Sequence, residues 1–242
     1  QPAGYGDGGE TAGTTGGDDT VNDIISAINL SAGEASTDND FDETLGSIAG
    51  SVVIDDNNDG VADAGETGIV GIEITLTGTD ALGDLVSLTT TTDGNGDYLF
   101  PSLLSGTYTV TEGPTLGFVD GGENPGSEGG DEANDVISNI VLPPGSDATD
   151  YDFGELIGAT ISGTVVDDAL NGIPSVTIGL GGTDVFGNPV SLSTTTDVNG
   201  DYLFDNLRPG IYIVTETQPA GYGDGGETAG TTGGDDTVND II

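Results

Sequence analysis

The sequence predicts an all-β chain of tandem Ig-like β-sandwich domains arranged as a repeat array. Short runs rich in Val, Ile, Thr and Tyr alternate apolar with polar residues, and clusters of Gly, Asn and Asp separate them. The same runs also recur along the chain. Alternation in short segments is typical of half-buried strands, and the clusters between them are typical of turns. No stretch shows a convincing helical period with caps.

Six strands are expected in order through the middle of the chain. They are SVVI at 51–54, GIEITLTG at 71–78, VSLTTTT at 86–92, DYLF at 97–100, TYTVTE at 107–112 and DVISNIVL at 135–142. β-Branched and aromatic residues suit a pleated surface that is buried on one face. About seven strands per repeat would let each repeat close its own core, which favours a sandwich over a stacked solenoid.

Two repeats of different length organise the chain. Residues 1–25 are identical to residues 218–242, and a weaker repeat relates 78–112 to 182–216. Each repeating unit then has about 110 residues, a typical domain size. A duplicated end without structural meaning is the alternative, but arrays with internal self-similarity are the commoner cause of such repeats.

The two repeats together define the expected domains. Residues 2–30 resemble 114–142, and DNDFDE at 38–43 resembles DYDFGE at 150–155. Residues 1–46 are expected to be the C-terminal part of a domain whose start lies in the preceding copy. Residues 47–156 are expected to form a complete domain. Residues 157–242 are expected to be the N-terminal part of a second domain, which the next copy completes.

The charge of the chain excludes several classes of function. Forty-three Asp and Glu residues face a single basic residue, Arg208, and there is no Lys, His, Cys, Met or Trp. Nucleophiles activated by His, Schiff bases and thiolate or imidazole metal sites are therefore excluded. Clustered Lys and Arg are needed for nucleic-acid binding, so nucleic acid is not an expected partner. No apolar run is long enough to span a membrane in this segment.

The same charge raises the question of how the chain folds. Low hydrophobicity with high net charge is the usual signature of disorder. Two carboxylates about 4 Å apart repel by roughly 4 kcal/mol at an effective dielectric of about 20, whereas a whole domain is stable by only roughly 5–15 kcal/mol. We therefore expect bound Ca²⁺ to supply the counter-charge that the chain lacks.

The loop DDNNDGVADAGE at 55–66 fits the twelve-residue calcium-loop pattern at every specified position. Gly60 falls at the sharp turn, and the flanking segments are expected strands, so the loop is EF-hand-like but set on a β scaffold. A solvated acidic turn is the alternative. The expected ligands are the side chains of Asp55, Asn57, Asp59, Asp63 and Glu66 and the backbone carbonyl of Val61. The equivalent segment at 163–180 has Asp167 and Asp168 but too few ligands, so one domain of each pair should bind this ion.

Two weaker sets of oxygen ligands are also candidates for metal binding. Asp93, Asn95 and Asp97, and their repeats Asp197, Asn199 and Asp201, place an oxygen at every second residue. A tight Asn-Gly hairpin turn explains that spacing at least as well. A further set of acids, with one Asn, is expected to gather ions where units meet, and an acidic loop is the alternative. Its members are Asp7, Glu10, Asp18, Asp19, Asn22, Asp23, Asp120, Asp131 and Asp135.

The order GSVVIDDNNDGVADAGE, then TTTTDGNGDYLF, then GTYTVTE, with PAGYGDG following the second TVTE-like strand, resembles the SdrD B-like domains of bacterial surface proteins. The resemblance implies a prealbumin-like β-sandwich of the Cna B kind that is stabilised by Ca²⁺ and located extracellularly or at the cell surface. The calcium loop of the family maps onto the side-chain ligands expected above. Some Cna B relatives form a Lys–Asn isopeptide bond assisted by a Glu, and Glu112 and Glu216 resemble that Glu. Because the chain has no Lys, the bond cannot form, and neither Glu is expected to be catalytic.

The favoured function is structural rather than enzymatic. We expect a repeat unit of a calcium-stabilised extracellular filament or surface stalk, whose copies join head to tail by a peptide bond or by strand exchange. One alternative is an adhesin repeat that itself binds a host, cell or mineral surface. Tyr5, Phe118 and Tyr222 are candidate contacts for it, although covering the edge of a core is the favoured explanation for these aromatics. The other is an accessory array of a larger secreted enzyme. Paired carboxylates of a glycosidase are disfavoured because the acids lie in Gly-rich turns.

Overall fold

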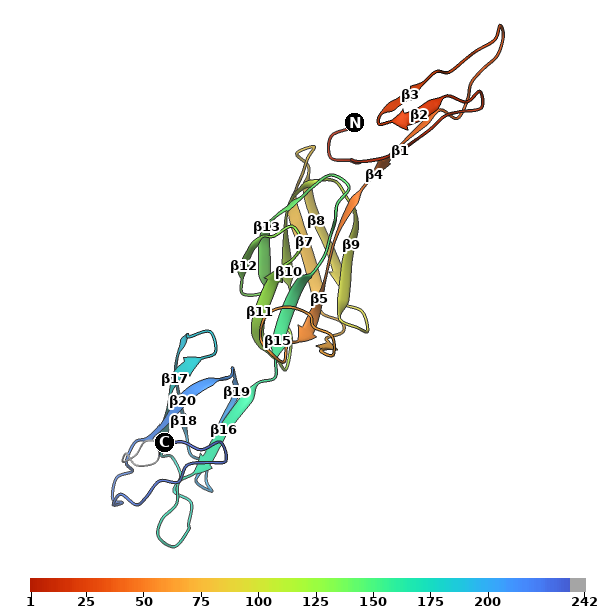
Figure 1. Ribbon diagram of the computed structural model, residues 1–242. Helices are drawn as coiled ribbons and strands as arrows, with labels where there is room; N and C mark the ends of the chain where they lie inside the picture. Colours follow the sequence, from red (N-terminus) through yellow and green to blue (C-terminus); the bar gives the residue numbers. More distant parts are fainter. Residues whose placement is uncertain (236–242) are drawn as a thin grey trace. The chain divides into compact units, whose positions relative to one another are not determined.

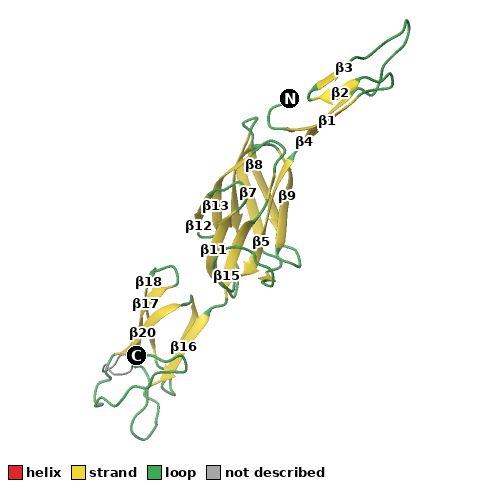
Figure 2. Ribbon diagram, in the orientation of Figure 1, coloured by secondary structure: helices red, strands yellow, loops and turns green. Residues whose placement is uncertain are grey.

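A computed structural model describes residues 1–235 of the chain, which fold into strands and turns without a helix (Figures 1 and 2). The all-β prediction is therefore confirmed. The structure divides into two compact units, the first of residues 1–116 and 120–155 and the second of residues 117–119 with those from 156 onward. Each unit is described by itself below.

The first unit contains a five-stranded antiparallel sheet. Its strands, in spatial order, are β12 (Asp131–Ala133), β13 (Val136–Leu142), β10 (Gly106–Glu112), β7 (Glu73–Asp80) and β8 (Leu85–Thr91). In the centre of this sheet Val110 lies opposite Leu76 on one side and Ile137 on the other. The expected strands at 71–78, 86–92, 107–112 and 135–142 all form, although β7 begins at Glu73 because residues 70 and 71 make a turn.

A second sheet lies against the first (Figure 1). It is built on β5 (Gly46–Ile54), and its other strands are β11 (Val119–Pro125), β15 (Tyr151–Leu156), β14 (Asp147–Ala148), β6 (Thr67–Gly68) and β9 (Asp97–Leu103). β14 and β15 run parallel to β5, whereas β6 and β9 run antiparallel to it. The expected strands at 51–54 and 97–100 are thus confirmed within β5 and β9.

The core of the first unit is formed by alternating residues of both sheets. Successive side chains of a strand point to opposite faces, so every second residue can be buried. Ile74 and Leu76 of β7 are fully buried, as are Ile48 and Val52 of β5. On β10 the same alternation buries Tyr108, Val110 and Glu112, which places a carboxylate at a core position.

Residues 1–45 add two small antiparallel pairs, β1 (Gly6–Thr11) with β4 (Asp40–Thr44) and β2 (Asp18–Val21) with β3 (Ile24–Ser26). Their side chains are mostly exposed. By the repeat these strands correspond to β11, β15, β12 and β13 of the complete sandwich. The sequences of β1–β4 thus match strands of the complete sandwich, but most of their side chains are not buried in a core.

The second unit repeats the first half of the sandwich. β16 (Ala159–Thr164) pairs with β19 (Asp201–Leu207), and β17 (Thr177–Asp184) lies between β18 (Pro189–Thr195) and β20 (Gly210–Glu216). Their register repeats that of the first unit, since Ile161 lies opposite Phe204 as Ile48 lies opposite Phe100. A smaller core results, formed by Ile173, Val176, Ile178, Leu180, Phe204 and Leu207. No strand follows β20 within the described residues.

Candidate cation sites

The loop at 55–66 connects β5 to β6 and is organised around a buried carboxylate. Asp55 is fully buried, and its side chain accepts the backbone N–H of Asn58 at 2.5 Å and of Gly60 at 2.7 Å. Gly60 has φ +79°, and a Cβ there would lie 2.8 Å from the carbonyl oxygen of Glu123. Only glycine fits this conformation without strain, so the turn position of the calcium-loop pattern has a structural reason.

The other expected ligands of this loop close over its backbone. Glu66 accepts the N–H of Asp56 at 3.0 Å and of Asp63 at 2.9 Å through its two carboxylate oxygens. The Asn57 amide donates to Asp59 at 3.0 Å and to Asp63 at 3.2 Å. The N–H of Val61 donates to Asp59 at 3.0 Å. The structure thus brings Asn57, Asp59 and Asp63 together, with Glu66 folded back from the end of the loop.

The loop carboxylates are directed at amide donors rather than at one another. No three of them place oxygens within 4.8 Å of one another in the described part of the chain. Carboxylate and amide oxygens at this spacing are nevertheless the ligands that Ca²⁺ takes in such loops. Calcium binding at residues 55–66 remains a prediction.

A buried aspartate fixes the loop to the neighbouring sheet. Asp152 of β15 is 3% exposed and accepts the N–H of Ser51 at 2.9 Å and of Ala62 at 3.3 Å. Burial raises the pKa of Asp152, and the two N–H donors oppose that rise. The last strand of the sandwich therefore positions the calcium-type loop.

The two sets with oxygens at alternate residues form tight hairpin turns. The Asp93 side chain accepts the N–H of Asn95 at 2.8 Å and of Asp97 at 3.1 Å. Asp197 repeats this arrangement with Asn199 and Asp201, at 2.8 and 3.0 Å. The structure therefore shows the turn that was the alternative explanation, and metal binding at these six residues stays an untested prediction.

Two of the acidic clusters come together as repeats of one arrangement. Asp120, Glu123 and Asp135 have carboxylate oxygens within 4.8 Å of one another, as do Asp7, Glu10 and Asp23. In both groups the last aspartate donates its backbone N–H to the glutamate. Asp135 donates to Glu123 at 2.8 Å, and Asp23 donates to Glu10 at 2.7 Å. Asp18, Asp19 and Asp131 join neither group. These three residues and Asn22 are exposed.

A third group contains two glutamates that were not expected as ligands. Glu112 at the end of β10, Asp135 before β13 and Glu155 in β15 place oxygens within 4.8 Å of one another. Glu112 is 6% exposed and Glu155 is fully buried. The Thr115 hydroxyl donates to Glu155 at 2.5 Å. The sequence signal that could have found Glu112 is its place in the alternation of TYTVTE, in phase with Tyr108 and Val110.

In this third group the buried carboxyl group of Glu112 lies among other carboxylates. Burial, followed by the charges of Glu155, Asp135, Asp120 and Glu123, raises the pKa of Glu112 to about 9. Burial also raises the pKa of Glu123. The only basic side chain of the sequence, Arg208, lies 3.6 Å from Asp184 and stacks over Phe186 in the second unit. The sequence contains no Lys, no His and no second Arg.

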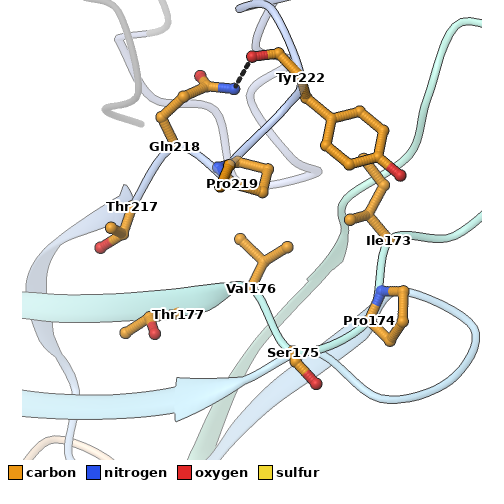
Figure 3. A pocket seen from close by; sticks show the side chains of 10 residues that line it. Ile173, Pro174, Ser175, Val176, Thr177, Thr217, Gln218, Pro219 and Tyr222 are labelled. Atoms are coloured by element: carbon orange, nitrogen blue, oxygen red, sulfur yellow. Dashed lines mark hydrogen bonds between the residues drawn. The ribbon is translucent and has the colours of Figure 1, made fainter.

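A hollow in the second unit has a different character (Figure 3). Ile173, Pro174 and Val176 line it, and Tyr222 reaches toward Ile173 from the segment after β20. No carboxylate lines this hollow, so it offers no cation site. Tyr222 is 48% exposed, whereas the other two candidate adhesive aromatics, Tyr5 and Phe118, are partly buried.

The fold and these acidic loops define a class of protein, the β-sandwich domain that occurs in tandem repeats. The chain belongs to the SdrD B-like domain family, whose profile matches residues 46–155 and 162–240. The predicted membership is therefore confirmed. The location of the chain is extracellular or at the cell surface, in keeping with this membership. None of the described residues forms a helix that is long and apolar enough to cross a membrane.

Curated relatives support the same assignment. Serine-aspartate repeat-containing protein F of Staphylococcus epidermidis is 33% identical over 177 residues, which are 69% of this chain and 10% of that protein. Serine-aspartate repeat-containing protein E of Staphylococcus aureus strain MSSA476 is 35% identical over 178 residues, which are 69% of this chain and 15% of that protein. The chain thus matches only a small part of the length of these relatives. Neither name is that of an enzyme, which agrees with the expected non-enzymatic role.

Solved structures show more distant similarity. GBS52, the minor pilin of Streptococcus agalactiae, has 15% sequence identity and a TM-score of 0.38, with 74% of this chain and 86% of that chain covered. The TIE protein of Bacillus anthracis has 18% identity and a TM-score of 0.35, with 90% of this chain and 34% of that chain covered.

Proposed function

We propose that the chain is a structural repeat of an extracellular bacterial filament or surface stalk, in which Ca²⁺ stabilises the domains and copies join head to tail. The proposal includes no catalytic role. Its main support is that residues 6–44 and residues 159–216 carry complementary halves of one sandwich. β16–β20 repeat β5 and β7–β10, and β1, β2, β3 and β4 repeat β11, β12, β13 and β15.

Three pairs of equivalent apolar residues support this joining. Ile140, Leu142 and Phe153 belong to the core of the complete sandwich and are 0%, 1% and 1% exposed. Their counterparts in the N-terminal segment are Ile28, Leu30 and Phe41, which are 37%, 59% and 53% exposed. Full burial of such a side chain stabilises by roughly 1.5–3 kcal/mol. Burial of Ile28, Leu30 and Phe41 in a core of the same kind would therefore stabilise the N-terminal segment.

The second unit has the matching gap. Tyr98, Tyr108 and Val110 are at most 4% exposed in the complete sandwich. Tyr202, Tyr212 and Val214, their counterparts, are only partly buried around the smaller core. A copy that delivered residues 26–46 to this unit would cover them, and the shared sequence of 1–25 and 218–242 would provide the connection. Joining by peptide bond and joining by strand exchange place the same residues in the same core.

The calcium part of the proposal is supported by charge and by the donor set of residues 55–66. The formal net charge is −42, and buried or crowded carboxylates destabilise a fold unless a cation opposes them. The loop supplies hard oxygen ligands, which suit Ca²⁺. Ca²⁺ that binds the folded domain more strongly than the unfolded chain stabilises the domain by mass action.

A tandem chain tests the joining directly. Residues 1–217 are followed without a linker by a second copy of residues 1–242, and amide hydrogen exchange is measured in Ca²⁺ for the single chain and for the tandem. We expect β16–β20 of the first copy to be protected only in the tandem. Phe41→Ser in the second copy should remove this protection, whereas Phe41→Ser in the first copy, which has no preceding unit, should not. Equal exchange in the single and tandem chains would contradict the joining.

A further inference from the structure

We infer that residues 2–6 are a docking segment for one end of the complete domain, and that in an array they attach each joined domain to the complete domain that follows it. The receiving surface consists of Ala81, Leu104, Ser105 and Gly145, which lie in the turns between β7 and β8, β9 and β10, and β13 and β14. The docking itself occurs within the single chain. Its role between copies rests on the proposed function.

The segment is held at its first glycine by a hydrogen bond and a close backbone approach. The N–H of Ser105 donates to the carbonyl oxygen of Gly4 at 2.8 Å. A Cβ on Gly4 would lie 3.2 Å from the Cβ of Ala81 and 3.3 Å from the Cβ of Leu104. Gly4 is buried there. A side chain at residue 4 would therefore push the segment away from the receiving surface.

A second pair of glycines brings the two backbones together again. A Cβ on Gly6 would lie only 2.5 Å from the Cα of Gly145. Gly6 begins β1, whose partner β4 leads into β5 of the complete domain through Leu45. The contacts of Gly4 and Gly6 thus add two points of attachment beside the covalent connection. Together they limit rotation about Leu45.

The same sequence occurs a second time without these contacts. Residues 218–223 are identical to residues 1–6. Gly221 and Gly223, the counterparts of Gly4 and Gly6, are exposed, and a Cβ on either would have nothing within 4 Å. Because the two sequences are identical, the burial of Gly4 and Gly6 comes from the surface that they contact.

The turn within the segment forms in both places. The N–H of Tyr5 donates to the carbonyl oxygen of Pro2 at 3.4 Å, and the N–H of Tyr222 donates to that of Pro219 at 3.3 Å. The glycines inside the two turns have φ +89° and +92°. A glycine at the third position with φ of about +80° is typical of a type II turn. The segment therefore has its docked conformation before it docks, which lowers the entropic cost of binding.

The equivalent surface of the second unit is built differently. The counterparts of the first three receiving residues are Val185, Arg208 and Pro209. Proline has no N–H, so Pro209 cannot donate the bond that Ser105 donates. Arg208 lies 3.6 Å from Asp184 in an ion pair. Pro209 is exposed, whereas Ser105 is half-buried. The docking segment therefore fits the complete domain and not the second unit, which distinguishes successive domains along an array.

Amide hydrogen exchange of the full chain in Ca²⁺ tests the docking. Gly4→Ala should raise the exchange rate of the Ser105 amide by roughly tenfold or more, because its hydrogen bond to residue 4 is lost. Gly221→Ala makes the same change in the same local sequence and should leave Ser105 as it is in the unmodified chain. The amides of β7 and β10 report on the fold and should be unaffected by either variant.

Gly6→Ala repeats the test at the second contact, with Gly223→Ala as its matched control. Gly6→Ala alone should speed the exchange of Ser105. Unchanged Ser105 exchange in both Gly4→Ala and Gly6→Ala would overturn the inference, as would an equal effect of the two control variants.

Backbone ¹⁵N relaxation provides a readout that needs no variant. In the unmodified chain β1 and β4 should share one rotational correlation time with β7 and β10. The triple variant Ala81→Val, Leu104→Arg and Ser105→Pro gives the complete domain the receiving residues of the second unit. In that variant β1 and β4 should tumble faster than the sandwich. Independent tumbling already in the unmodified chain would contradict the docking.

The tandem chain separates this inference from the joining of copies. If the copies do not join, β16–β20 of the first copy stay unprotected, but Ser105 of the second copy is still as protected as in the single chain. If joining occurs without docking, β16–β20 are protected and Ser105 exchanges as fast as in Gly4→Ala. The first result would contradict only the joining, and the second would contradict only the docking.

Discussion

The backbone N–H of Glu112 donates to the carbonyl oxygen of Asp135 at 2.9 Å, so a bond between the main chains holds the two carboxylates beside each other. The first residue ends β10, which belongs to the first half of the sandwich, and the second precedes β13, which belongs to the other half. The acidic group therefore forms only when the two halves meet. This is the division at which we propose that copies join.

Stability of the cation-free chain should fall as the pH rises. The pKa of Glu112 is raised from its ordinary value of 4.5 to about 9, chiefly by burial. A carboxyl group whose pKa is higher in the folded state favours folding fully below pH 4.5, and that contribution is lost as the pH rises to about 9. Denaturant unfolding in chelator at several pH values checks this slope. Glu112→Gln should flatten it, and an equal slope in both chains would contradict the assignment to Glu112.

Asp55 should matter even without calcium. Asp55→Ala leaves the N–H groups of Asn58 and Gly60 without their acceptor in a buried loop, which should lower the free energy of unfolding by about 2–4 kcal/mol. Urea unfolding in chelator measures the change. Asp56→Ala alters the adjacent exposed carboxylate and should change stability by less than about 0.5 kcal/mol. Equal effects would show that Asp55 does not organise the loop.

Gly60 should tolerate no side chain. Gly60→Ala places a Cβ 2.8 Å from the Glu123 carbonyl at φ +79°, and we expect a loss of about 2–4 kcal/mol from backbone strain and the close contact together. Gly83→Ala is the control, because its φ is +87° but nothing lies within 4 Å of the added Cβ. That variant should lose only about 1 kcal/mol. The difference between the two midpoints in urea isolates the contact.

Two equivalent phenylalanines should differ in the single chain. Phe153→Ala removes a core side chain that is 1% exposed and should destabilise the first unit by about 3–5 kcal/mol. Phe41→Ala removes its counterpart, which is 53% exposed, and should change the stability of the single chain by less than about 1 kcal/mol. Calorimetric unfolding compares them. A large loss from Phe41→Ala would mean that residue 41 already lies in a core.

The strands were predictable because their burial alternates. TYTVTE and GIEITLTG have the period of a half-buried sheet, and both became strands close to the expected residues. β15 gives no such signal, because all of its residues from Tyr151 to Leu156 are buried and two of them are acids. β11 reads VDGGENP, which resembles a turn, and it forms a strand only because it pairs with β15.

The candidate sites also differ in how well the sequence alone predicts them. The loop at 55–66 is a local pattern, so its position between two strands could be expected from spacing alone. The group of Glu112, Asp135 and Glu155 depends on contacts between segments far apart in the sequence. Glu112 and Glu155 lie within apolar strand patterns, where a charged residue is rarely buried without a partner. Tertiary structure was needed to show that they face one another.

Calorimetry of the tandem chain tests the central claim most directly. In Ca²⁺ the tandem should show an unfolding transition of a complete joint domain that the single chain lacks, and chelator should lower its Tm by roughly 10 °C or more. Phe41→Ser in the second copy should remove that transition and leave the others unchanged. A tandem whose unfolding is the sum of two single chains, or whose joint domain unfolds at the same temperature with and without Ca²⁺, would contradict the account of a calcium-stabilised repeat joined head to tail.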